Sequence, residues 1–439
     1  MIRRELNLRD VVFFTISGVL GTRWLSASAH AGPGAVTLWA LAAILFFVPC
    51  AWAIATLSKK YPQQGGLYVW TREDFGDWHG FLCFWLYWFG IALWFPNAVM
   101  AYSSMAVYAL GPAYTYLANE RAYIVVASLI LIWISLGSHL VGLRYGKITQ
   151  ILGFIGSYGV GAMLVLIAGA IWFRGGASAT HFNFIPRFDF ETINFWAQIS
   201  YALTGLEMAP VMGEEIEDPE RTLPRAAWIS TVACSGYYSL ATAALLVLMP
   251  PESVNVLYGL AEGGHLAGLK LGLAWLGPVF AGCIFLGALG QIGALGAAAA
   301  RLPYVVGAYR HFPAAFAKLH HRWRTPYISI LTLAGFASGA LLLFQLGETV
   351  RAAYSLLVDL MVLATFIPFL YIFASSWKCG NRVSAVSGCL VSLLALACSL
   401  VPPSDVRNVW IFEAKLIGGT LVLVLLARWI FVRAERSRA

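Results

Sequence analysis

The sequence predicts an all-α integral membrane protein with twelve transmembrane helices, and three observations indicate this fold class. Of the 439 residues, 60% are hydrophobic and only 11% are charged. The mean hydropathy is +0.74, far above the range of soluble domains. Apolar runs of about twenty residues, enough to cross a bilayer as a helix, recur along the whole chain.

Twelve apolar runs define the expected helices. They lie at 11–31, 34–58, 79–110, 122–140, 147–173, 190–214, 226–250, 272–300, 326–346, 350–376, 384–402 and 412–432. The segments between them are too short for a soluble domain. We therefore expect a single transmembrane domain over residues 1–439.

The basic residues are distributed unequally between the two sides of this expected bundle. With the N-terminus inside, 21 Lys and Arg residues lie on that side and 7 on the other. Cytoplasmic loops carry an excess of Lys and Arg, so we expect a multi-pass protein of the cytoplasmic membrane with both termini in the cytoplasm. The net charge of +8 is dispersed over short loops, which argues against a nucleic-acid partner.

Two of the apolar segments are interrupted by small residues. FTISGVLGTRW at 14–24 belongs to the first expected helix, and ISYALTGLEM at 199–208 belongs to the sixth. Small residues also serve close helix packing in membranes. A matched pair of interrupted helices, however, is typical of the substrate site in transporters built from repeats.

The positions of the two breaks suggest an internal repeat. They divide the first ten helices into sets of five, at 11–173 and 190–376, with two additional helices at 384–432. Because five is odd, the second set must cross the membrane in the opposite direction to the first. We therefore expect a five-plus-five inverted repeat.

The chemistry of a broken helix suits an amino acid. Backbone N–H and C=O groups freed by the break must find other partners or line a cavity. A carboxylate accepts from N–H groups at a half-helix N-terminus, and an ammonium donates to carbonyls at a half-helix C-terminus. The breaks therefore predict a zwitterion site made largely of backbone.

Three expected loops carry patterned sequences. They are LSKKYPQQGGLYVW at 57–70, EEIEDPERTLPRA at 214–226 and FPAAFAKLHHRWRTP at 312–326. In this order, and together with SGVL and YALTGLE, they resemble the amino acid, polyamine and organocation superfamily of permeases. The resemblance covers the first ten helices.

This resemblance implies a set of substrate-binding residues. Relatives hold the carboxylate with the glycine stretch of helix one and the ammonium with carbonyls of helices one and six. Carried over by position, the set is Ser17, Gly18, Val19, Leu20, Gly21, Tyr201, Ala202, Leu203, Thr204 and Gly205. Tyr201 occupies the place of an aromatic gate, and Asn97 that of a polar residue which contacts the substrate side chain. The alternative for Tyr201 is a packing or lipid-interface role. The alternative for Asn97 is a hydrogen bond to a carbonyl freed by Pro96.

Three ionisable residues lie inside expected spans at positions that the membrane interfaces do not explain, where they indicate function by default: Arg23, Glu207 and Asp359. Glu207 matches an acid that relatives use in proton coupling or gating. Arg23 departs from the family pattern, which has a proline or an aliphatic residue there. It either pairs with Glu207 or Asp359, or faces the pocket and binds an acidic substrate.

The sequence disfavours two common coupling mechanisms. The stretch 290–301 has no Ser or Thr for a sodium site of the usual kind. Ser157 stands where many proton-coupled relatives have a lysine. Proton movement through another acid, exchange and facilitated uptake remain open. In the loop at 214–226, Arg221 and Arg225 can meet the neighbouring acids, either as weak surface pairs or as an inner gate.

We therefore expect a secondary active transporter that moves amino acids by alternating access, either proton-coupled or as an exchanger. A polyamine or other organic cation is the alternative substrate. The eight histidines are scattered and form no metal or catalytic pattern, so we expect neither an enzyme nor a cofactor or metal. The expected partners are the substrate and membrane lipid, while a homodimer or accessory subunit is left open.

Overall fold

The computed structural model describes residues 6–140, 143–173, 176–186, 190–344, 350–400 and 409–436. The described part of the first half of the chain contains eight α-helices. They are α1 (Leu8–Val19), α2 (Trp24–His30), α3 (Gly34–Ala42), α4 (Val48–Lys60), α5 (Leu67–Phe75), α6 (Asp77–Ala106), α7 (Arg121–Ser138) and α8 (Leu143–Phe173). A π-helical segment, Ala43–Phe47, joins α3 to α4 without interruption.

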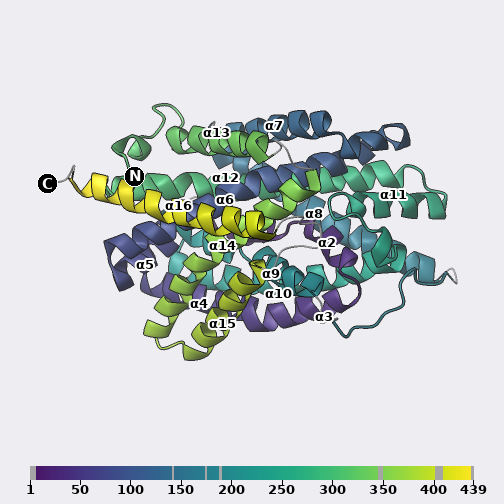
Figure 1. Cartoon of the computed structure of the whole chain (residues 1–439), viewed down its shortest axis with the longest axis horizontal. Coiled ribbons are helices and arrows are strands. Elements are labelled where there is room, and N and C mark those ends of the chain that lie inside the picture. Colours follow the sequence, from purple (N-terminus) through teal and green to yellow (C-terminus); the bar gives the residue numbers. More distant parts are fainter. Residues whose placement is uncertain are drawn as a thin grey trace.

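The second half contains α9 (Phe190–Ala202), α10 (Pro219–Leu248), α11 (Gly259–Leu271), α12 (Leu276–Ala308), α13 (Tyr327–Phe344), α14 (Val350–Lys378), α15 (Arg382–Ser399) and α16 (Val409–Arg436). A 3₁₀ segment, η4 (Leu206–Glu215), follows α9. The long helices run side by side, and the two ends of the chain lie at the same end of the bundle (Figure 1).

The molecule is a multi-pass membrane protein by the length and composition of its helices. Among the described residues, nine helices are long and apolar enough to span a membrane, and the bent pair α1 and α2 makes ten. The expected sixth span is divided between α9 and η4, and the apolar part of α13, Tyr327–Leu343, is short. These two segments account for the difference from the twelve that the sequence predicts.

Several boundaries differ from those expected. Helix α10 begins at Pro219 rather than at 226, because proline is well accommodated in the first turn of a helix, where its missing N–H is not needed. Helix α12 continues to Ala308 rather than ending at 300. The expected polar loops after the second and seventh spans contain α5 and α11. Helix α11 lies at the end of the bundle away from the termini (Figure 1).

Helix α1 lies in the interior, where it packs against α8, α10 and α12. The contact between α8 and α12 is especially close at Gly153 and Gly290. A Cβ atom on either glycine would lie 2.3 Å from the Cα atom of the other. Only glycine permits this approach, so small residues set the distance between two helices that support the first break.

Candidate substrate site at the two helix breaks

The first apolar helix is interrupted where the sequence predicts. Helix α1 ends at Val19, Leu20 adopts an extended conformation (φ −74°, ψ 94°), and α2 resumes at Trp24 with a bend of 45°. All residues from Phe14 to Ala29 are buried. At Gly21, a Cβ atom would lie 2.8 Å from Trp24 Cδ1 and 2.9 Å from Gln291 Nε2, so no larger residue fits without displacing them.

Side chains from α10 and α12 bond to this first break, and a backbone carbonyl of α8 accepts a hydrogen bond from it. Tyr238 Oη on α10 donates to Val19 O (2.8 Å) and accepts from Gly21 N (2.9 Å). Gln291 Nε2 on α12 donates to Gly18 O (3.3 Å). The Ser17 hydroxyl donates to Gln150 O on α8 (3.1 Å). Several backbone groups freed by the break are therefore satisfied by the protein itself.

The second break lies between α9 and η4. The peptide N–H of Leu203 lies 3.3 Å from the carbonyl oxygens of both Ile199 and Ser200, and Thr204 N donates to Tyr201 O (2.9 Å). Gly205 has φ +128°, a conformation that residues with a side chain rarely adopt. Tyr201, Ala202, Leu203 and Gly205 are buried and Thr204 is partly buried.

The fold brings the two breaks together. A Cβ atom on Gly205 would lie 2.9 Å from Val19 Cγ2 and 3.4 Å from the Val19 backbone. Gly18 faces Met208 of η4 at ordinary contact distance. Two segments almost two hundred residues apart thus meet deep inside the bundle, and each contact has a glycine on one side.

Arg23 is fully buried beside the first break. It donates through Nη1 to Asn97 Oδ1 on α6, and its guanidinium carbon lies 4.0 Å from the ring centroid of Trp24 and 5.8 Å from that of Trp94. The Trp24 ring in turn contacts Tyr201 edge to face, with 6.1 Å between centroids. Arg23, Asn97 and Tyr201, which the sequence separates widely, therefore form one cluster around Trp24.

Glu207 stabilises the second break. Neither of the roles expected from the sequence, proton coupling or gating on the one hand and an ion pair with Arg23 on the other, includes this function. Its Oε1 accepts from Tyr87 Oη (2.6 Å), and its Oε2 accepts from Gly205 N (2.8 Å). Both carboxylate oxygens are thus engaged in holding the second break and fixing it to α6. No pattern in the sequence distinguishes Tyr87 from the many other aromatic residues of this helix.

The two remaining candidates lie further along the supporting helices. Asp359 is buried on α14, which packs along α6. Ser157 is buried on α8 and faces α12, since a Cβ atom on Gly287 would lie 2.7 Å from its Oγ. Ser157 thus belongs to the close contact between α8 and α12.

Thr22 is a residue of the site that the sequence did not indicate, and its hydroxyl is buried. It lies in the first break, between Gly21 and Arg23, and has no hydrogen-bond partner within the described part of the chain. A buried polar group of this kind calls for an explanation, and a bound ligand is one. In the sequence, the one indication of its role is its position between two proposed site residues, Gly21 and Arg23.

A nearly buried ion pair joins η4 to α12 at the end of the bundle that contains the termini. Glu215 at the end of η4 accepts two hydrogen bonds from Arg301 of α12, at 2.5 and 3.0 Å, with both side chains nearly buried. Leu6 pairs with the same segment, donating to Glu215 O and accepting from Glu217 N. Removing one partner of such a buried pair costs about 3–5 kcal/mol.

Of the two arginines expected to meet acids in the loop at 214–226, Arg221 does so and Arg225 does not, among the described residues. Arg221 lies 3.7 Å from Asp218, but both side chains are mostly exposed, so the pair contributes little. Arg225 forms no ion pair with a described residue. The buried ion pair instead joins η4 to α12 through Arg301, which lies outside the loop at 214–226.

Comparison with known proteins gives a consistent family. A family model described as amino acid permease matches residues 6–402. An uncharacterized transporter of Legionella pneumophila is 27% identical, over 98% of this chain and 97% of the relative. Uncharacterized transporters of Mycobacterium bovis and Mycobacterium tuberculosis are each 27% identical over 74% of this chain and 71% of the relative.

Proposed function

This chain belongs to the amino acid permease family within the amino acid, polyamine and organocation superfamily, and from that premise we propose that it transports an amino acid by alternating access. The contact between the two helix breaks is the observation that carries the proposal. Gly205 and Val19 touch inside the bundle, so a small zwitterion between the half-helices reaches both.

The recognition chemistry follows from the residues at this contact. The substrate carboxylate accepts from N–H groups and from the Thr22 hydroxyl at the first break. Its ammonium donates to carbonyl groups around Leu203 and Thr204 at the second. Tyr201 covers the substrate, and Asn97, held by Arg23, meets its side chain. The buried cation of Arg23 close to the site disfavours a polycation as substrate.

The proposal includes the five-plus-five inverted repeat in a chain of twelve spans, with both termini in the cytoplasm. The positions of the broken helices α1–α2 and α9–η4, each at the start of a set of five, support it. In that orientation Glu215 and Arg301 close the cytoplasmic side. This pair must separate when the site opens inward. Exchange or proton coupling drives the cycle, since 290–301 offers no hydroxyl for sodium.

A thermal-shift screen of the purified protein against the common amino acids and against polyamines tests the substrate class. A ligand at a hundred times its Kd stabilises the folded protein by about 2.7 kcal/mol, so a subset of amino acids should raise the Tm by several degrees. Stabilisation by polyamines alone would contradict an amino acid substrate.

A further inference from the structure

A groove on the outer surface of the bundle lies apart from the helix breaks. It has a volume of about 950 Å³ and lies between the ends of α4, α10 and α14. Four cationic residues line it: Lys59, Lys60, Arg225 and Lys378. No acidic side chain is among its described lining residues. The groove therefore favours an anionic occupant.

Two of these four cations are held by α5. Lys60 Nζ lies 3.5 Å from Asp74 Oδ1, and Lys378 Nζ donates to Asp74 O at 2.5 Å. Lys59 and Arg225 are exposed and, among the described residues, form no ion pair. These two cations are available to a ligand from outside the chain.

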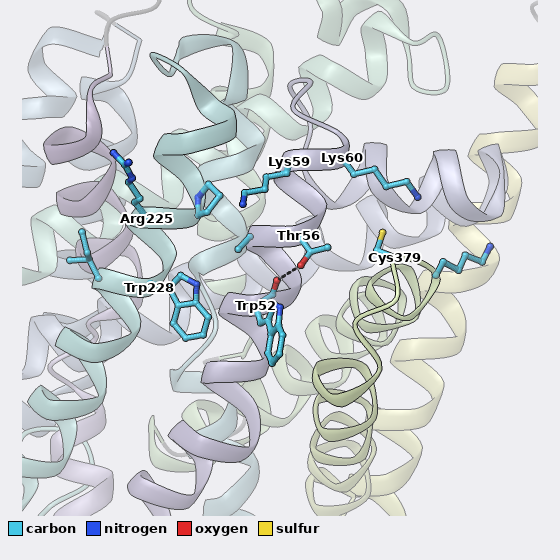
Figure 2. Close-up of a pocket in the computed structure, with 11 residues that line it drawn as sticks. Trp52, Thr56, Lys59, Lys60, Arg225, Trp228 and Cys379 are labelled. Carbon is cyan, nitrogen blue, oxygen red and sulfur yellow. Dashed lines mark hydrogen bonds between the residues drawn. The ribbon is translucent and has the colours of Figure 1, made fainter.

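The groove changes character along the helices. Figure 2 shows Lys59 and Arg225 at one level, and Trp52 and Trp228 at a second level below them. Trp52 precedes Lys59 by two helical turns, about 10 Å along the axis. The two tryptophans are 47% and 40% exposed, so their rings face the surroundings of the bundle. Exposed tryptophan near the end of a membrane-spanning helix is typical of the interface between lipid head groups and acyl chains.

We propose that this groove binds an anionic phospholipid. Its phosphate lies between Lys59 and Arg225, and its acyl chains run along Trp52, Trp228 and Ile229. Basic pockets between transmembrane helices recognise head groups in this way. The proposal requires only that the chain spans a membrane, so it stands or fails independently of the transported substrate.

Native mass spectrometry of the purified protein with phosphatidylglycerol, and with phosphatidylcholine as a zwitterionic reference, tests the proposal. Each cation near an anionic head group contributes about fivefold in affinity, so Lys59→Gln with Arg225→Gln should weaken phosphatidylglycerol binding about thirtyfold. Each single variant should weaken phosphatidylglycerol binding about fivefold, so the single variants test the proposal if the double variant does not fold. Phosphatidylcholine binding should not change.

The matched control is Arg433→Gln with Arg436→Gln, which removes the same charge from exposed positions on α16. It should leave phosphatidylglycerol binding intact. The proposal would be overturned if the unmodified protein bound phosphatidylglycerol and phosphatidylcholine equally. It would also be overturned if the groove double variant and the α16 double variant lost phosphatidylglycerol binding to the same extent. Full displacement of the lipid by glycerol 3-phosphate at equal concentration would overturn it as well, since that ligand offers the phosphate without the acyl chains.

Discussion

Gly205→Ala is expected to reduce uptake by on the order of tenfold or more while the protein still inserts and folds. The new Cβ atom would lie 2.9 Å from Val19 Cγ2, and the residue would have to keep φ +128°. Backbone strain and overpacking each cost about 1–3 kcal/mol, and about 1.4 kcal/mol corresponds to a factor of ten. The methyl group therefore forces the two breaks apart where we place the substrate.

Gly76→Ala is the matched control for this variant. Gly76 also has a positive φ, +94°, but no atom lies within 4 Å of the position its Cβ would take. The control thus introduces backbone strain without touching either break. It should lower the Tm and leave the uptake per folded molecule unchanged. Equal uptake by the two variants, measured after size-exclusion chromatography, would mean that the contact between the breaks is ordinary helix packing.

Arg23→Gln is expected to lower uptake and stability together. The variant loses a charge-assisted hydrogen bond to Asn97, which contributes about 1.5–3 kcal/mol, and a cation–π contact with Trp24 of about 0.5–2 kcal/mol. Arg23→Lys keeps the charge without the planar stacking and should be intermediate. Arg9→Gln is the control, because Arg9 is exposed and lies over Phe13 at the start of α1.

The pattern of this loss among substrates defines what Arg23 does. Its contacts with Asn97 and Trp24 indicate a residue that positions the wall of the site. We therefore expect Arg23→Gln to weaken the binding of neutral and acidic amino acids equally. A loss confined to aspartate and glutamate would mean instead that the guanidinium binds the substrate side chain.

The positions of the breaks could be predicted because their cause is local. Ser17, Gly18 and Gly21 interrupt one apolar segment, and Thr204 and Gly205 interrupt the other, so the pattern is visible in the sequence. The helical class follows in the same way from hydropathy alone. That the two breaks touch could only be expected by resemblance to a repeat-built transporter.

The residues that hold the breaks could not be predicted, because their partners are distant in sequence. Tyr238 and Tyr87 are two aromatics among many, and their spacing contains nothing that indicates a bond to Val19 or Glu207. Gln291 gave a weak signal, as an amide within an otherwise apolar helix. Because Gln291 carries no hydroxyl group, the absence of Ser and Thr from 290–301 did not point to it.

Counterflow into proteoliposomes tests the transport of amino acids through these breaks most directly, because it requires neither a known coupling ion nor a known direction. Purified protein is reconstituted into liposomes loaded with an unlabelled amino acid, and the entry of the same amino acid in labelled form is followed. We predict transient accumulation in loaded liposomes, none in empty ones, and little with Gly205→Ala. Accumulation of a polyamine but of no amino acid, or undiminished counterflow by Gly205→Ala, would contradict the proposed site.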